Sequence, residues 1–338
     1  MSGGSVFTVY GRITAADFQR CAEAAAYVNQ KYPEYYAITV ARELQRDYFD
    51  RWDAWASAGQ LPPQQQSTAD TAPPESGALT TTVPTTAGEP SAVLVEQHGS
   101  GNEPPRLLTV EMFLREITSR TDYRPDASGE YYVAQGQQAW HAFLASRDRQ
   151  YCWMDVSVNG LAAGRIWFEL YSAVAPLTCK NFCELCRGTM VAMEDTGAHN
   201  NALDAPPEQQ LRRIGYKGAT FFRILKDAWV MGGDVTGEHS GNGGYSCYGR
   251  CFPDETHAIP HDTAGILGMC NDGPHTNSSA FYITRRPMPW MNGKYVAFGR
   301  VMDGMHVVDA IHAVEVRHNQ SPKATITITD CEVLDTSL

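Results

Sequence analysis

The sequence lacks the features of a membrane or exported protein. It has no apolar run approaching the roughly 18 residues that a spanning helix needs. It begins MSGGSVFTVYGR, without a basic segment, a long apolar stretch and a cleavage site. We therefore expect a cytoplasmic protein with no membrane partner. Basic side chains are also few, since 27 lysines and arginines face 38 acidic residues and the net charge is −11. Because nucleic-acid affinity comes largely from basic side chains that neutralise phosphates, we expect no nucleic-acid partner.

A disulfide framework is absent as well. The nine cysteines are an odd number and no export signal accompanies them, so we expect reduced thiols. Cys183 and Cys186 form a CxxC with Cys179 one turn before it, but no second pair follows at the spacing of a zinc site. The same spacing fits the buried face of a helix, so core packing is favoured over a metal or redox role. Cys247 and Cys251 bracket a turn and are interpreted in the same way, although they could pair under oxidation. We expect no metal and no cofactor.

Length and composition predict two domains, because 338 residues exceed the usual size of one core. The first spans residues 1–122. It is interrupted at about 59–90 by an insertion rich in Pro, Thr, Ser and Gln, which has almost nothing to bury and is predicted to be disordered. We expect strands at 6–10 and 36–40, a helix that starts at Thr14 with a capping box to Asp17, a helix at 43–55, a hairpin at 92–95 and 107–110, and a helix at 111–120.

This order of elements, β-α-β-α-β-β-α, is similar to that of thioredoxin-like and glutaredoxin-like domains. A redox member of that fold needs a low-pKa cysteine at the amino end of the first helix, where the helix dipole stabilises a thiolate. Residues 12–16, RITAA, contain none, and Cys21 lies farther along on the predicted apolar stripe. We therefore expect a thioredoxin-like α/β domain without redox activity. Pro90, just before the third strand, is a candidate cis-proline.

The rest of the chain predicts a connector and a mainly β domain. Residues 123–150 are a connector of mixed character, with one short helix around Trp140. From residue 151 to 338, an alternating hairpin with Asn159-Gly160 at its turn is followed by short strands and by two helices, at 178–187 and about 307–312. This pattern favours a closed β-barrel capped at each end. A long insertion at about 189–214 is either a binding or regulatory loop or a disordered segment.

Separated strings in this second domain occur in the order typical of one family. They are GRIWFELY, APLTCKNFCELC, YKGATFFRI, GGD, GILGMCNDGPHTNSSAFYIT, WMNGKYVAFGRVMDGMHVVDAI and ITITDCEVL. On the basis of these strings, the segment from about residue 155 to residue 334 resembles the cyclophilin-type peptidyl-prolyl cis-trans isomerases. The resemblance implies a closed eight-stranded barrel capped by two helices. It also implies an isomerase that acts on proline-containing protein segments without a cofactor.

The chemistry of this family requires no nucleophile and no metal. Rotation about an X-Pro amide faces a barrier of about 18–20 kcal/mol, because the nitrogen lone pair is delocalised into the carbonyl. A catalyst must hold the proline ring in an apolar pocket, grip the backbone, and donate a hydrogen bond to the nitrogen of the twisted amide. The resemblance places the catalytic guanidinium at Arg223, within Phe221-Phe222-Arg223-Ile224.

Several site positions depart from the family pattern. Ala228 stands at the position of a pocket phenylalanine, and Trp229 follows it, so the indole either refills the pocket or plugs it. Met231 and Ala280 replace two glutamines, and the change at Met231 removes a partner that helps to orient the arginine. Tyr282 replaces a pocket phenylalanine and adds a hydroxyl that needs a hydrogen-bond partner. The substrate-binding residues that the resemblance implies are Phe221, Trp229, Met231, Gly241, Cys270, Asn271, Asp272, Ala280, Tyr282, Trp290, Met291 and Tyr295, whereas His261 is expected to be structural.

These departures leave two functions open. The first is a weak peptidyl-prolyl isomerase, and the alternative is a catalytically impaired cyclophilin that serves as a binding or structural module. A thioredoxin-like segment joined to a divergent cyclophilin, with the strings VYGRITAADFQ and WVMGGD, resembles a cilium-associated branch of the family, the cyclophilin-like protein six type. The resemblance implies the ciliary axoneme as an alternative location, with ciliary or microtubule-associated proteins as partners. A thioredoxin-type oxidoreductase is a third alternative, which the missing cysteine disfavours.

Overall fold

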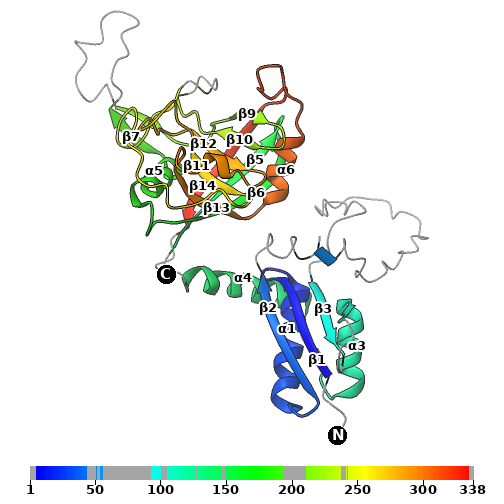
Figure 1. Cartoon of the computed structure of the whole chain (residues 1–338). Coiled ribbons are helices and arrows are strands. Elements are labelled where there is room, and N and C mark those ends of the chain that lie inside the picture. Colours follow the sequence, from blue (N-terminus) through cyan, green and yellow to red (C-terminus); the bar gives the residue numbers. More distant parts are fainter. Residues whose placement is uncertain are drawn as a thin grey trace, which may run out of the picture. The chain divides into compact units, whose positions relative to one another are not determined.

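The computed structural model describes residues 5–43, 51, 54–55, 93–99, 105–125, 128–146, 149–192, 211–236, 241 and 243–334. The chain forms two compact units, Met1–Phe143 and Leu144–Leu338 (Figure 1). Within the described residues, no helix combines the length and the apolar character that crossing a membrane requires.

The first unit is built on a four-stranded sheet in the order β2-β1-β3-β4. The central strand β1 (Ser5–Arg12) runs parallel to β2 (Tyr36–Glu43) and antiparallel to β3 (Val93–His98), which pairs antiparallel with β4 (Arg106–Leu108). Parallel neighbours need a crossover connection. Helix α1 (Ala16–Lys31) provides it.

The two faces of this sheet carry different layers, because successive side chains of a strand point to opposite sides. Phe7 and Val9 share one buried core with α1 and with α3 (Val110–Arg120). Tyr10, on the other face, packs with Trp55 and Leu94. The predicted strands and the helices at 14 and 111 are therefore present, and helices cover one face of the sheet together.

Some local predictions for this unit are wrong or lie outside the described residues. The capping box at Thr14 is not formed, because α1 begins behind Ala15 without a side-chain cap. Instead, the Gln19 amide donates to the Ile13 carbonyl at 2.6 Å. Glu43, the expected start of a helix, is the last residue of β2. Most of that expected helix, the insertion at 59–90 and Pro90 lie outside the described residues.

Helix α4 (Gly129–Ala145) is longer than the short helix expected around Trp140. Its glycine at 136 allows close packing, because a Cβ there would lie 2.7 Å from the Thr14 carbonyl oxygen. Tyr132 donates to the Glu23 carboxylate at 3.3 Å, and Tyr123 donates to the same oxygen at 3.1 Å. Helix α4 therefore packs against the junction between β1 and α1.

The second unit is a curled eight-stranded sheet in the order β14-β5-β6-β13-β11-β12-β10-β9, with every neighbouring pair antiparallel. Its two edge strands meet at an isolated bridge between Thr220 and Thr327, so among the described residues the barrel closes through a bridge and not through a continuous ladder. The turn at Asn159-Gly160 has positive φ at both residues, as the predicted hairpin requires. The strands are β5 (Gln150–Val158), β6 (Leu161–Leu170), β9 (Phe221–Leu225), β10 (Trp229–Gly232), β11 (Ile266–Met269), β12 (Phe281–Thr284), β13 (Ala297–Asp303) and β14 (Ile326–Leu334).

The two predicted helices are α5 (Pro176–Arg187) and α6 (Met305–Ala313), which Figure 1 places on opposite sides of this unit. Phe182 of α5 lies at the centre of the core, with ring centroids 5.0–5.8 Å from four other aromatic rings: Phe168, Tyr216, Phe281 and Phe298. Close-packed rings of this kind stabilise a core beyond the apolar area they bury.

Most cysteines of this unit are buried, but Cys247 is half-buried and Cys251 is exposed, so the core packing expected for these two is wrong. Cys152 of β5 and Cys183 of α5 place their sulfur atoms 3.8 Å apart. Burial raises the pKa of the Cys152 and Cys186 thiols well above the ordinary value, so both stay protonated. None of the nine cysteines forms a disulfide. In the part of the chain that the structure describes, no group of three or more His, Cys, Asp or Glu side chains is arranged to hold a metal ion.

The long insertion has an ordered base. β7 (Thr189–Ala192) and β8 (Leu211–Ile214) form a separate two-stranded antiparallel ribbon. The Tyr245 hydroxyl donates to the Ala192 carbonyl at 2.8 Å, which attaches the ribbon to the barrel. Residues 193–210 between the two strands lie outside the described residues.

Candidate functional site

The site lies on the outer face of strands β9, β10 and β12. Arg223 of β9 is directly opposite Met231 of β10, which is directly opposite Tyr282 of β12. The alternate residues of these strands, such as Ile224 and Val230, point into the barrel core. One row of side chains across three strands therefore carries the predicted catalytic arginine and two of the predicted pocket residues.

A bulge in β9 determines on which face of the sheet Phe221 lies. The register shifts between Met231 and Gly232, so that Gly232 pairs with Phe221 and Phe222 is the extra residue. Phe221 consequently turns into the barrel core, with its ring centroid 5.8 Å from that of Phe281. Of the predicted substrate-binding residues, Phe221 is thus buried behind the sheet and does not line the outer face.

A second hydrophobic cluster, separate from the barrel core, packs beside Arg223. We call it the site cluster. It contains most of the predicted pocket residues and two that sequence reasoning missed, Leu225 and Met288. Leu225 follows Arg223 by two positions and so could have been found from strand alternation, whereas Met288 lies in a loop without such a signal. Its buried members are Ala228, Cys270, Tyr282, Met288 and Met291, and its half-buried members are Leu225, Trp229, Met231, Ala280 and Tyr295.

Aromatic rings form one wall of the site cluster. The ring centroids of Trp229 and Trp290 are 5.8 Å apart, and those of Trp290 and Tyr295 are 6.3 Å apart. Trp290 follows Pro289 in a short 3₁₀ turn, η3 (Pro289–Met291), and its side chain is 50% exposed. The Trp229 indole is half-buried and turned toward Trp290 beside the small Ala228. It therefore supplies an aromatic surface next to the position where the family has a phenylalanine.

Arg223 carries a free charge beside the site cluster, since it is directly opposite the cluster residue Met231. Its side chain is exposed, and among the described residues its guanidinium has no hydrogen-bond or ion-pair partner. Met231, opposite it, offers only a weakly accepting thioether. The Cys270 thiol lies close enough for the arginine charge to counteract slightly the rise in the thiol pKa that burial causes. The guanidinium is therefore available to a ligand but is not oriented by a neighbouring side chain.

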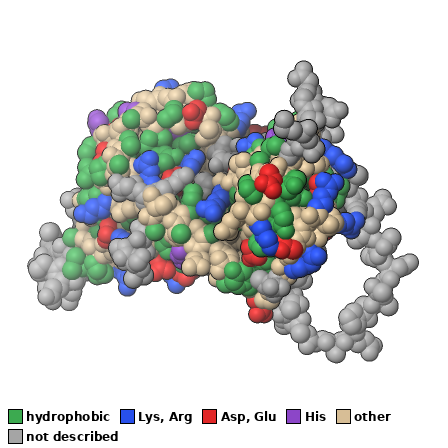
Figure 2. Space-filling model, turned by 90° about the horizontal axis from the view of Figure 1, so that it is seen from below, with side chains coloured by type: hydrophobic (Ala, Val, Ile, Leu, Met, Phe, Trp, Pro, Cys, Tyr) green, Lys and Arg blue, Asp and Glu red, His purple; other side chains and the backbone are tan. Residues whose placement is uncertain are grey.

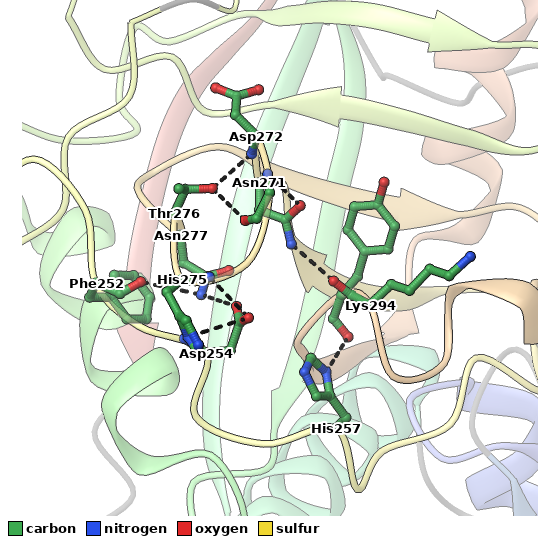
Figure 3. A network of polar contacts seen from close by, with 11 residues as sticks. Phe252, Asp254, His257, Asn271, Asp272, His275, Thr276, Asn277 and Lys294 are labelled. Carbon is green, nitrogen blue, oxygen red and sulfur yellow. Dashed lines mark hydrogen bonds and ion pairs between the residues drawn. The ribbon is translucent and has the colours of Figure 1, made fainter.

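The loop after β11 is held rigidly by side-chain hydrogen bonds (Figure 3). The Asn271 amide donates to the Lys294 carbonyl at 3.1 Å, and the Thr276 hydroxyl accepts from the backbone N–H of Asp272 at 2.9 Å. Asn277 donates to the Asp254 carboxylate at 2.8 Å. In the described part of the chain, the backbone N–H and carbonyl of Asn271 have no partner of their own. They can therefore bind the backbone of an extended peptide.

Gly241 and Ala280 border the same region. The Gly241 N–H donates to the buried Asp234 carboxylate at 2.9 Å, and a Cβ at 241 would lie 2.4 Å from the Phe222 ring. This places the Gly241 loop directly against the residue that precedes Arg223. The Ala280 carbonyl accepts from the Cys270 N–H at 2.9 Å, and its methyl group carries no polar atom. The hydrogen bonds of a glutamine at 280 are therefore missing.

The hydroxyl that Tyr282 adds has found a partner. It lies 2.5 Å from Nε2 of His261, which is fully buried. Burial raises the pKa of Tyr282 and lowers the pKa of His261, so both groups are neutral. The histidine expected to be only structural therefore touches a residue of the site cluster.

On the face drawn in Figure 2, the described Lys and Arg side chains are interspersed with Asp, Glu and hydrophobic side chains. A binding surface for a phosphate backbone would instead gather basic residues on one face.

Comparison with known proteins gives the same assignment for the second unit. Residues 153–333 match the family described as cyclophilin type peptidyl-prolyl cis-trans isomerase/CLD. The mouse NK-tumor recognition protein is 38% identical over 195 residues, which are 58% of this chain and 12% of that protein. The human protein named "Probable inactive peptidyl-prolyl cis-trans isomerase-like 6" is 34% identical over 223 residues, which are 66% of this chain and 65% of that protein. The Arabidopsis thaliana peptidyl-prolyl cis-trans isomerase CYP22 is 34% identical over 197 residues, which are 58% of this chain and 90% of that protein. The chain thus spans less than two thirds of the length of the mouse and human relatives.

Proposed function

Because this chain belongs to the cyclophilin-type peptidyl-prolyl cis-trans isomerase family, we propose that its second unit binds proline-containing protein segments and catalyses X-Pro rotation weakly. One observation carries the proposal: a free guanidinium, Arg223, stands in one row with Met231 and Tyr282 at the edge of an apolar cluster. No covalent bond is made or broken, so the residues present suffice for the reaction.

Each requirement of the reaction has a group to meet it. The site cluster takes the proline ring, because its buried side chains are apolar. The backbone N–H and carbonyl of Asn271 hold the peptide beside the proline. Arg223 then donates a hydrogen bond to the proline nitrogen, which gains a lone pair only when the amide is twisted. An interaction made only in the transition state raises the rate.

The same geometry accounts for weak activity. Among the described residues no side chain orients Arg223, so the entropy of a long flexible side chain is lost when it is ordered in the transition state. A hydrogen bond to a charged group contributes about 1.5–3 kcal/mol net when well placed. Part of that free energy is used to order the Arg223 side chain, so less of it lowers the barrier to X-Pro rotation.

NMR exchange spectroscopy of short Ala-Pro peptides tests this proposal. The full chain should accelerate exchange, Arg223→Ala should abolish the acceleration, and Arg223→Lys should retain only a small part, since lysine lacks the planar guanidinium. Equal exchange rates with the wild type and with Arg223→Ala would refute catalysis by this site.

A binding module without turnover is the second candidate. The replacement of two glutamines by Met231 and Ala280 favours it, as does the word "inactive" in the names of the isomerase-like 6 relatives. In that case Arg223→Ala would still bind a proline-containing segment with the affinity of the wild type. We also propose the cytoplasm and the ciliary axoneme as locations, with ciliary or microtubule-associated proteins as partners, on the resemblance of the whole chain. A tagged protein found only in cytosol, and absent from isolated cilia, would contradict the ciliary part.

For the first unit we propose a thioredoxin-like domain, residues 1–122, joined by a connector of 123–150 to the cyclophilin domain of 151–338. The sheet order β2-β1-β3-β4, with only β3 antiparallel to β1, supports this. We propose no redox role, because no cysteine lies at the start of α1 and because Gly136 of α4 packs against Thr14 there. An insulin-reduction assay with the full chain should give no activity above buffer.

A further inference from the structure

The strand next to Tyr282 leaves room for its hydroxyl. Gly268 of β11 is directly opposite Tyr282 of β12. A Cβ at 268 would lie 2.1 Å from the Tyr282 hydroxyl oxygen and 2.3 Å from the adjacent ring carbon. Real side chains do not approach so closely, so any residue other than glycine would displace the ring. The absence of a side chain at 268 therefore creates a slot that the tyrosine occupies.

A chain of hydrogen bonds determines which nitrogen of His261 carries the imidazole proton. Oδ1 of Asn292 accepts from the backbone N–H of His261 at 2.8 Å, which fixes the orientation of the amide. The same oxygen lies 2.9 Å from Nδ1 of His261, so Nδ1 carries the imidazole proton. Nε2 then has a lone pair, and it accepts the Tyr282 hydroxyl proton at 2.5 Å. Both ring nitrogens of the buried His261 and the Tyr282 hydroxyl thus have a hydrogen-bond partner, and the exposed Asn292 supplies the oxygen for Nδ1.

The hydrogen bond restrains a buried ring of the site cluster. Tyr282 is 2% exposed, and its ring lies edge-on to Tyr295, with centroids 5.9 Å apart. The imidazole of His261 lies at the hydroxyl end of the same ring, with the ring centroids 5.9 Å apart and the ring planes inclined by 29°. A tyrosine held at its hydroxyl cannot change rotamer without breaking that bond, whereas a phenylalanine at 282 would have no such restraint.

We propose that His261 is a positioning residue for the proline site: through its hydrogen bond it holds Tyr282 in the slot above Gly268 and so keeps the floor of the site cluster fixed. This inference rests on the proposed function, because it assumes that the site cluster binds proline. The charged and titratable groups that act on His261 are His257 and Asp262, with opposite effects. Neither lies between the imidazole and Tyr282, so the restraint depends on the neutral imidazole itself.

The test compares two substitutions at one position in the full chain. His261→Gln keeps an oxygen that can accept the tyrosine hydroxyl, and His261→Leu keeps the volume but removes the acceptor. In NMR titrations with an Ala-Pro peptide, we expect His261→Leu to weaken binding about fivefold, the factor that corresponds to one neutral hydrogen bond. His261→Gln should bind the peptide almost as tightly as the wild type. His312→Leu is the matched control, since His312 is also buried but lies on α6, and it should bind like the wild type.

The outcomes separate this inference from the proposed function. Equal peptide affinity for His261→Leu and the wild type, or a His261 ring protonated on Nε2 in ¹⁵N spectra, would overturn the positioning role. If His261→Leu does not fold, Tyr282→Phe removes the same hydrogen bond and should weaken binding to the same extent; unchanged affinity would again overturn it. A wild-type protein that binds no proline peptide refutes the proposed function, while the ring tautomer still decides whether His261 accepts from Tyr282.

Discussion

Placing an amide beside Arg223, the proposed catalytic arginine, should increase the isomerase activity that we propose. Met231 is directly opposite Arg223, and side chains so paired have Cβ atoms about 4.5–5.5 Å apart, within reach of a hydrogen bond between a glutamine and a guanidinium. A well-placed hydrogen bond to a charged group contributes about 1.5–3 kcal/mol. If about half of that, roughly 0.8–1.5 kcal/mol, is gained in the transition state through better orientation of Arg223, Met231→Gln should accelerate isomerisation about fourfold to tenfold, since 1.4 kcal/mol corresponds to a factor of ten.

The assay is the exchange rate between cis and trans Ala-Pro peptide at saturating peptide concentration. Met231→Leu is the control, because it keeps an apolar side chain of similar volume and adds no amide, and it should match the wild type. The double variant Met231→Gln with Arg223→Ala should lose the gain completely, because the glutamine acts only through the guanidinium. An unchanged rate for Met231→Gln, in a protein where Arg223→Ala abolishes catalysis, would refute the argument that Arg223 lacks an orienting partner.

Two further predictions concern His312, which lies on α6, and Gly241, which lies beside the site. His312→Leu should raise the free energy of unfolding by about 1–2 kcal/mol in urea titrations at pH 7, because both ring nitrogens are buried without a partner among the described residues. Burial, with the nearby charge of Arg285, lowers the pKa of His312 to about 4 from an ordinary 6.5. The unfolded chain therefore binds the proton first, and stability should fall as the pH drops from 6.5 toward 4, less steeply in the leucine variant. Gly241→Ala should weaken peptide binding in NMR titrations, because its methyl group would clash with Phe222 beside the arginine. Gly218→Ala is the control with a similar positive φ and open space, and equal affinities for the two variants would contradict this.

Local patterns in the sequence were sufficient for most of the second unit. The Asn159-Gly160 turn, the alternation of the flanking strands and the two helices lie within a few residues of their predicted positions. They could be predicted because turn geometry and strand alternation depend on neighbouring residues. In the first unit the strands are present as well, but the Thr14 cap is absent: α1 begins behind Ala15 without a side-chain cap, and the Gln19 amide donates to the Ile13 carbonyl.

The sequence by itself determined the family, and it placed the arginine that we propose as catalytic, because motifs such as FFRI and GGD are contiguous and can be read without a structure. Only the tertiary structure decided what surrounds that arginine. The bulge at Phe222 turns Phe221 into the core, and the contact of Trp229 with Trp290 joins residues far apart in the chain. The hydroxyl of Tyr282 likewise finds its partner in His261 across the sheet, in space left by Gly268. Such contacts depend on strand register and on close packing between distant segments, and neither is encoded in any local stretch of sequence.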